Sequence, residues 1–261
     1  MYPELFRIGT FEVTSFGAMM AVAILVGVWL FRLELRRAGL PADAADAGLI
    51  GAVGGLTGAK LLWSIEHAGE SRLAELLFSR GGLSWYGGLI GGVGTGLAYI
   101  RLRRFPIIPT LAAATPALAF GHLIGRIGCF LVGDDYGRPT ALPWGVAFPE
   151  GLPPTPVPVH PTQLYEAVGL GILGWRLMRW RRSGLPDAVV LGRYLLISGT
   201  LRFAIEFIRV NQRVVGVLSV AHLVSLTTAI GGTALLLKKH ELSRSGERTI
   251  QADPKDSSRT C

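Results

Sequence analysis

Residues 13–31 read VTSFGAMMAVAILVGVWLF and contain no charged side chain. A helix of about 20 apolar residues is long enough to cross the hydrocarbon core of a bilayer, which is about 30 Å thick. The stretch does not have the pattern of a cleavable signal peptide, because its apolar run is too long and its cluster of arginines follows it. It therefore predicts a membrane-spanning helix.

Six further stretches of the chain are also mainly apolar. Residues 81–100, 105–125 and 214–237 also lack charged side chains. The other three are interrupted by charges: residues 47–65 contain Lys60, residues 162–175 contain Glu166, and residues 188–208 contain Arg193, Arg202 and Glu206. A charge at membrane depth is costly and usually functional. The seven stretches predict an all-α, polytopic integral membrane protein with about seven transmembrane helices.

The composition supports this class and excludes an ordinary soluble domain. Half of the 261 residues are apolar, the mean hydropathy is +0.43, and only 17% of the residues are charged, compared with about 25% in soluble proteins. The net charge of +8 could suggest nucleic-acid binding. If the N-terminus lies outside, however, 16 of the 26 lysines and arginines fall on inside segments, as the positive-inside rule requires. We therefore predict an outward N-terminus, a cytoplasmic C-terminus and no nucleic-acid partner.

Two segments differ in composition from the spans. Residues 133–161 hold eight of the fifteen prolines and cannot be helical throughout; we expect an outer loop there. Residues 240–261 are polar and are expected to form a disordered cytoplasmic tail. Residues 1–239 are then one transmembrane domain. Its glycine-rich faces, including residues 51–58 and 87–92, are typical of helices that pack backbone against backbone.

The first candidate site lies in residues 121–137, which read GHLIGRIGCFLVGDDYG. Prolines at 106, 109 and 116 precede it and favour a broken or re-entrant helix. His122, Arg126 and Cys129 share one helical face. An arginine among glycines suits a phosphate group, because a guanidinium binds phosphate oxygens in a bidentate fork. The alternative is that Arg126 pairs with Asp134 or Asp135 and caps the helix end.

The second candidate site is the stripe formed by Arg202, Glu206 and Arg209, which are spaced four and three positions apart. Two arginines and a glutamate on one face of an apolar span should face an interior polar chamber and not lipid. A purely structural ladder of ion pairs is the alternative.

Two further segments contain polar or aromatic groups near the predicted outer surface. Residues 80–92 read RGGLSWYGGLIGG, and Trp85 and Tyr86 there could simply be interfacial aromatic residues. Residues 160–166 read HPTQLYE. His160 could serve as a base or as a hydrogen-bond donor to a phosphate, or it could have no role in function. Two cysteines, Cys129 and Cys261, exclude a disulfide framework and a cysteine-based zinc site. No metal-protease, Walker or Rossmann motif is present, so no metal or other cofactor is expected.

Taken together, these motifs resemble the prolipoprotein diacylglyceryl transferase family of bacteria. The resemblance extends from Phe16 and Gly17 to Arg209 and rests on four motifs in the family's order and spacing: GGLSWYGGLIGG, GRIGCF, HPTQLYE and RFxxExxR. It implies a seven-span enzyme of the bacterial inner membrane. Its partners would be phosphatidylglycerol, the surrounding lipid bilayer, and a preprolipoprotein signal peptide that carries a lipobox cysteine. The enzyme would transfer the diacylglyceryl group to that thiol, form a thioether and release glycerol 1-phosphate.

The resemblance also implies roles for individual residues. The catalytic set would be Arg126, Arg202, Tyr86 and Glu206. The set that binds the phospholipid or substrate would be Arg126, Arg209, Gly133, Asp134, Gly137 and His160. Within these sets, Arg126 and Arg202 would face the phosphate, Glu206 and Arg209 would orient them, and the two glycines would shape the loop.

The chain departs from the family's well-studied form at three positions. Tyr86 stands where that form has a histidine, Cys129 where it has an asparagine, and Asp134, followed by Asp135, where it has a glutamate. A phenol has an ordinary pKa near 10 and is a poor base, so Tyr86 is interpreted as a hydrogen-bond donor. The alternative function is a paralogue with altered catalysis that binds or translocates phospholipid.

Overall fold

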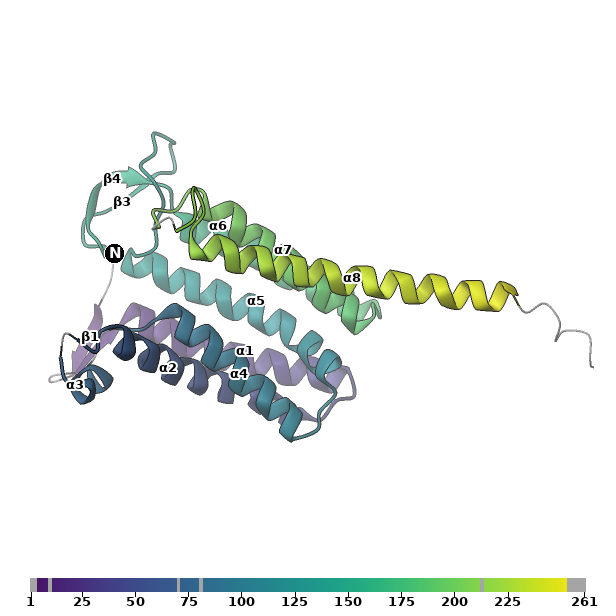
Figure 1. Ribbon diagram of the computed structural model, residues 1–261. Coiled ribbons are helices and arrows are strands. Elements are labelled where there is room, and N and C mark those ends of the chain that lie inside the picture. Colours follow the sequence, from purple (N-terminus) through teal and green to yellow (C-terminus); the bar gives the residue numbers. More distant parts are fainter. Residues whose placement is uncertain (1–3, 9–10, 70, 80–81, 212–213, 253–261) are drawn as a thin grey trace, which may run out of the picture.

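The computed structural model describes residues 4–8, 11–69, 71–79, 82–211 and 214–252. Within this part of the chain, seven helices have 18 or more residues (Figure 1). They are α1 (Ser15–Arg37), α2 (Asp46–Glu66), α4 (Trp85–Leu102), α5 (Ile107–Val132), α6 (Thr162–Arg182), α7 (Asp187–Glu206) and α8 (Val220–Ala252). Each overlaps most of one of the seven predicted stretches, because backbone polar groups in a bilayer can be satisfied within a helix.

Five of these helices are long and apolar enough to cross a membrane. They are α1, α2 with the short helix η1 (Ala42–Ala45) before it, α5, α7, and the Val220–Lys238 part of α8. Helix α4 is rich in glycine, and α6 carries Glu166 and four arginines. A helical, multi-pass membrane protein is therefore established. The number of about seven spans and the orientation stay predictions.

The all-α prediction is incomplete, because the described chain also contains strands outside the long helices. Strands β1 (Glu4–Ile8) and β2 (Phe11–Thr14) form one antiparallel pair. Strands β3 (Val146–Phe148) and β4 (Thr155–Val159) form another within the proline-rich segment 133–161, which is not helical throughout, as predicted. Proline removes a backbone donor and favours extended backbone, which suits a short edge strand such as TPVPV better than a helix. A six-residue helix, α3 (Leu73–Phe78), lies between α2 and α4.

The helices form two groups on either side of α5 (Figure 1). Helices α1, α2 and α4 lie on one side, and α6, α7 and α8 lie on the other. Glycines allow α2 and α4 to touch, as predicted from their glycine-rich faces. A Cβ atom added at Gly58 would lie 2.4 Å from the carbonyl oxygen of Gly87, and one added at Gly87 would lie 2.2 Å from the carbonyl oxygen of Gly58.

The expectation of a broken helix at residues 105–125 is wrong, because α5 is continuous through Pro116. Proline cannot donate to the carbonyl four positions earlier, which belongs to Ala112. The hydroxyl of Thr115 donates to that carbonyl at 2.9 Å instead. Pro106 and Pro109 stand at the cap and in the first turn, where a missing donor has no helical partner to lose.

The two ends of the bundle have different chemistry. The connections after α1, α4 and α6 lie at one end, and the basic residues Arg36, Arg37, Arg101, Arg103, Arg104 and Arg182 are exposed there. At the same end, the buried carboxylate of Glu34 pairs with Arg37 at 2.6 Å and with Arg181 at 2.8 Å, which joins α1 to α6. The strands and the ends of α5 and α7 lie at the opposite end (Figure 1).

Helix α8 continues past residue 240, where the predicted disordered tail begins. Residues 253–261 of that tail, including Cys261, lie outside the described residues.

Candidate functional site

A cavity of about 380 Å³ opens at the end of the bundle that carries the strands. A volume of this size is within the range of small-molecule sites. Its lining comes from the start of α4, the last turns of α5 and α7, the loops after them, and the start of α8. The lining residues are Trp85, Tyr86, Arg126, Asp135, Arg202, Glu206, Arg209, Asn211, Val214, Ser219, Val220 and Ala221.

Glu166 of α6 pairs with two arginines of this cavity but is not itself part of the lining. Its Oε2 atom lies 3.0 Å from Nε of Arg126 and 3.4 Å from Nη1 of Arg202, while its Oε1 atom lies 3.4 Å from Nε2 of His122. The side chain of Glu166 is only 2% exposed. A buried carboxylate of this kind offsets the desolvation of both guanidinium groups and fixes their spacing.

Glu206 links Arg202 to the third arginine, Arg209. Its Oε2 atom is 2.8 Å from Nη2 of Arg202 and 3.7 Å from Nε of Arg209. Its Oε1 atom accepts hydrogen bonds of 2.6 Å from both the hydroxyl of Ser219 and the amide of Asn211. Glu206 is fully buried and is held by four neighbours.

Asp135 completes the arrangement in the loop after α5. Its carboxylate pairs with Nη1 of Arg126 at 2.9 Å and with Nη2 of Arg209. Burial alone would raise the pKa of Asp135, but the guanidinium groups of Arg209 and Arg126 outweigh it and hold that pKa below its ordinary value.

The three arginines and three carboxylates therefore form one closed ring of alternating charge, which we call the charge ring. Its members, in order, are Arg126, Glu166, Arg202, Glu206, Arg209 and Asp135. The formal charge of the ring is zero. Oriented guanidinium groups on a cavity are suited to bind a phosphate group and to stabilise negative charge that develops on it.

A family model described as prolipoprotein diacylglyceryl transferase matches residues 3–238 of the chain.

The chain belongs to the prolipoprotein diacylglyceryl transferase family.

Three bacterial relatives, each named phosphatidylglycerol–prolipoprotein diacylglyceryl transferase, are similar to it over most of their length. The protein from Clostridium tetani is 33% identical over 89% of this chain and 95% of its own. The protein from Geobacter sulfurreducens is 34% identical over 83% and 85%, and that from Vibrio vulnificus is 31% identical over 90% and 90%. As a member of the prolipoprotein diacylglyceryl transferase family, the chain is a transferase, and its helices make it a multi-pass membrane enzyme.

All four residues assigned to catalysis by the family resemblance line the cavity: Tyr86, Arg126, Arg202 and Glu206. Arg209, assigned to binding, lines it as well. Tyr86 is the second residue of α4, is 37% exposed, and meets the ring of Trp85 edge to face with ring centroids 5.4 Å apart. Of the motif at residues 80–92, Arg80 and Gly81 lie outside the described residues.

The other four residues assigned to binding by the family resemblance are not part of the lining of the cavity. Gly133 ends α5 with a φ of 77°, a left-handed conformation that favours glycine. Gly137 packs so closely that an added Cβ atom would lie 2.8 Å from Thr162 and 2.9 Å from His160. The ring Nδ1 atom of His160 is 3.3 Å from the hydroxyl of Tyr165.

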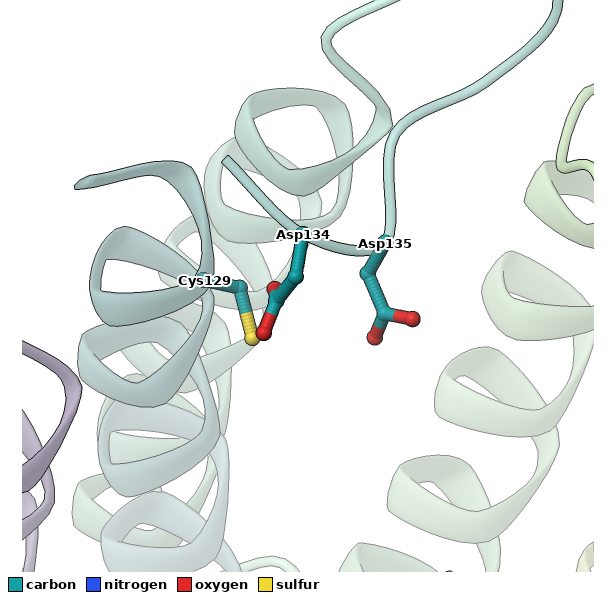
Figure 2. Close-up of side chains that lie close together, drawn as sticks. All are labelled: Cys129, Asp134 and Asp135. Atoms are coloured by element: carbon teal, nitrogen blue, oxygen red, sulfur yellow. The ribbon is translucent and has the colours of Figure 1, made fainter. Parts of the chain in front are cut away.

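Asp134 is the fourth of these residues, and it points to a different place from Asp135. Figure 2 shows its side chain against that of Cys129, with Asp135 to one side of that pair. Burial raises the pKa of Asp134, and the charge of Asp135 adds to the effect. The amide of Gln163 donates to the backbone carbonyl of Asp134. Asp135, and not Asp134, therefore faces the arginines.

The ligand atoms of Cys129, Asp134 and Asp135 lie within 4.8 Å of one another, a spacing that could hold a metal ion (Figure 2). The surroundings do not suit a cation. Nη1 of Arg126 is 4.0 Å from Sγ of Cys129, and two guanidinium groups already pair with Asp135. Positive charge at these distances opposes binding of a second positive charge.

Sequence reasoning did not assign site roles to Glu166, Asp135, Asn211 and Ser219. Glu166 gave a usable signal, because it is a carboxylate inside an otherwise apolar stretch. Asn211 and Ser219 gave none, since polar residues in the segment between two helices are common. Their role follows only from their contacts with Glu206.

Proposed function

We propose that this enzyme transfers the diacylglyceryl group of phosphatidylglycerol to the lipobox cysteine thiol of a preprolipoprotein. The relatives' names supply both substrate classes. In this reaction a carbon–sulfur bond forms at the carbon of the diacylglyceryl group that carries the phosphate. The bond between that carbon and the phosphate oxygen breaks. The thiol gives up a proton, and glycerol 1-phosphate leaves with the oxygen. The protein product is a thioether.

The observation that carries the proposal is the convergence of three guanidinium groups on one cavity. The reaction increases the negative charge on the departing phosphate, and positioned cationic donors stabilise such charge most effectively where water is limited. Arg126 and Arg202, which share Glu166, would hold the phosphate. Arg209 and Glu206 would fix their orientation, and Tyr86 would donate a hydrogen bond from the facing helix.

We propose further that the enzyme lies in the bacterial inner membrane with about seven spans and an outward N-terminus. The separation of chemistry along the bundle supports this orientation. The exposed arginines of the connections after α1, α4 and α6 would then be cytoplasmic, and the cavity would face outward. A site among helix ends would be reached by lipid from the bilayer and by a signal peptide from the outer surface.

The decisive experiment measures thioether formation with phosphatidylglycerol and a lipobox peptide in detergent or vesicles. Arg126→Ala and Arg202→Ala should each lower product formation to background, while thermal melting confirms that the variants are folded. Product formed at the wild-type rate by either folded variant would contradict the assignment of the site.

The departures at Tyr86, Cys129 and Asp134 leave a second outcome to test. A paralogue that only binds or translocates phospholipid would bind phosphatidylglycerol without forming product. Complementation of a transferase-depleted strain separates the two functions, because only an active enzyme restores lipoprotein maturation. Failure to complement, together with intact lipid binding, would favour the paralogue.

A further inference from the structure

The three carboxylates of the charge ring differ in their exposure to solvent. Glu166 and Glu206 are 2% and 0% exposed, whereas Asp135 is 42% exposed. Glu206 also accepts hydrogen bonds from Ser219 and Asn211. The side chain of Asp135 is the ring's accessible carboxylate on the cavity, and it is held by the two arginines.

The position of Asp135 is that of an anion bound between two guanidinium groups. It bridges Arg126 and Arg209, with one carboxylate oxygen on each. A phosphodiester could bridge the same two groups with its two free oxygens, because carboxylate and phosphate match the guanidinium fork in the same way. The two anions cannot occupy this place together.

Charge balance leads to the same conclusion. The ring has three positive and three negative groups, so an added phosphodiester would give the cavity an uncompensated negative charge. That cost is avoided if one carboxylate turns away as the phosphate arrives. Asp135 lies in a loop, at a φ of 60°, and follows the left-handed cap Gly133. It is therefore the ring carboxylate best placed to move.

We propose that Asp135 is an internal competitor for the phosphate group of the lipid substrate. Before the lipid binds, Asp135 pairs with Arg126 and Arg209 and compensates the charge of these buried cations. The phosphodiester displaces it during binding, and it returns when glycerol 1-phosphate leaves. Asp135 is thus a positioning residue that sets lipid affinity. The inference rests on the proposed function, because it takes phosphatidylglycerol as the ligand.

The test compares Asp135→Asn with the wild type by equilibrium binding of a fluorescent short-chain phosphatidylglycerol to the purified full-length protein. Losing a competing charge-assisted contact should lower the dissociation constant about tenfold, since such contacts are worth a factor of this order or more. The KM for the lipid should fall in parallel. Binding of the matching diacylglycerol, which has no phosphate, should not change.

Two further variants distinguish competition from a structural role. Asp135→Glu keeps a competing carboxylate and should restore an affinity near that of the wild type. Asp187→Asn is the matched control, because Asp187 is a similarly exposed aspartate (39%) paired with an arginine, at 3.2 Å, at the opposite end of α7. It should leave lipid affinity unchanged.

Unchanged or weaker binding of phosphatidylglycerol by folded Asp135→Asn would overturn the inference. If that variant does not fold, Asp135→Ser is measured in its place. Failure of both neutral variants to fold would also overturn the inference, because a carboxylate essential to the fold could not be displaced by each substrate molecule. Absence of turnover and of phosphatidylglycerol binding in the wild type would instead contradict the proposed function.

Discussion

Glu166 offers the sharpest test of whether the charge ring positions the catalytic arginines. Glu166→Gln keeps the shape of the side chain and removes its charge. Arg126 and Arg202 would then each keep one carboxylate partner, Asp135 and Glu206 respectively. Neutralising one member of a buried ion pair costs about 3–5 kcal/mol. Because both arginines keep a partner, we expect a loss of stability near the lower limit, about 3 kcal/mol.

The effect on turnover should be separate from the effect on stability. Without the negative charge that they share, the two guanidinium groups are held less tightly at their distances of 3.0 and 3.4 Å from one oxygen atom of residue 166. A displacement of about 1 Å at a reacting group can lower the rate about a hundredfold. We therefore expect turnover per folded molecule to fall by between about tenfold and a hundredfold.

Glu34→Gln is the matched control. Glu34 is 1% exposed and also bridges two arginines, Arg37 and Arg181, but at the far end of the bundle. It should lower the melting temperature by a similar amount and change turnover per folded molecule by less than about twofold. The assay measures thioether product at saturating lipid, normalised to the folded fraction from thermal melting. Equal turnover in the two variants would refute the positioning role of Glu166.

Two further predictions concern packing and acid stability. Gly58→Ala should destabilise the protein by about 1–3 kcal/mol, because its Cβ atom would lie 2.4 Å from a backbone carbonyl of α4. Gly94→Ala, whose Cβ atom would have no neighbour within 4 Å, should be neutral or stabilising in the same melting experiment. Equal melting temperatures for the two variants would contradict the close contact of α2 and α4. Because the pKa of Asp135 is held below its ordinary value, its contribution to stability is complete above the unfolded pKa of about 3.9 and is lost as the pH falls through the lower, folded value. The melting temperature should therefore fall less steeply below about pH 4 in Asp135→Asn than in the wild type. Identical acid profiles would show that the ion pairs of Asp135 do not stabilise the fold.

The positions of the seven long helices could be predicted from the sequence because the bilayer leaves few alternatives. An apolar stretch about 20 residues long has to satisfy its backbone polar groups internally. The continuity of α5 could not be predicted, because the sequence does not show that the hydroxyl of Thr115 donates to the carbonyl of Ala112, which Pro116 leaves without a helical donor. Short strands in the proline-rich segment were missed for a related reason, since their pairing depends on where the flanking loops bring the backbone.

The arginines of the site could be predicted, but not their partners. Arg126, Arg202 and Arg209 are charges within or beside apolar stretches, so the sequence alone indicates that they have a function. The sequence allowed Arg126 to pair with Asp134 or Asp135, and nothing in the local spacing chose between them. In the structure Arg126 pairs with Asp135, and the side chain of Asp134 lies against that of Cys129 (Figure 2).

The sequence by itself determined that this protein is a helical membrane protein with buried cations, because hydrophobic length and the cost of burying charge are local properties of the chain. The closed ring was decided only by the tertiary structure. Arg202 and Glu166 are 36 positions apart, and they meet because α6 and α7 bring them together beside α5. Electrostatic attraction becomes strong only at such short distances and with little water, so the packing of the helices decides which charges interact.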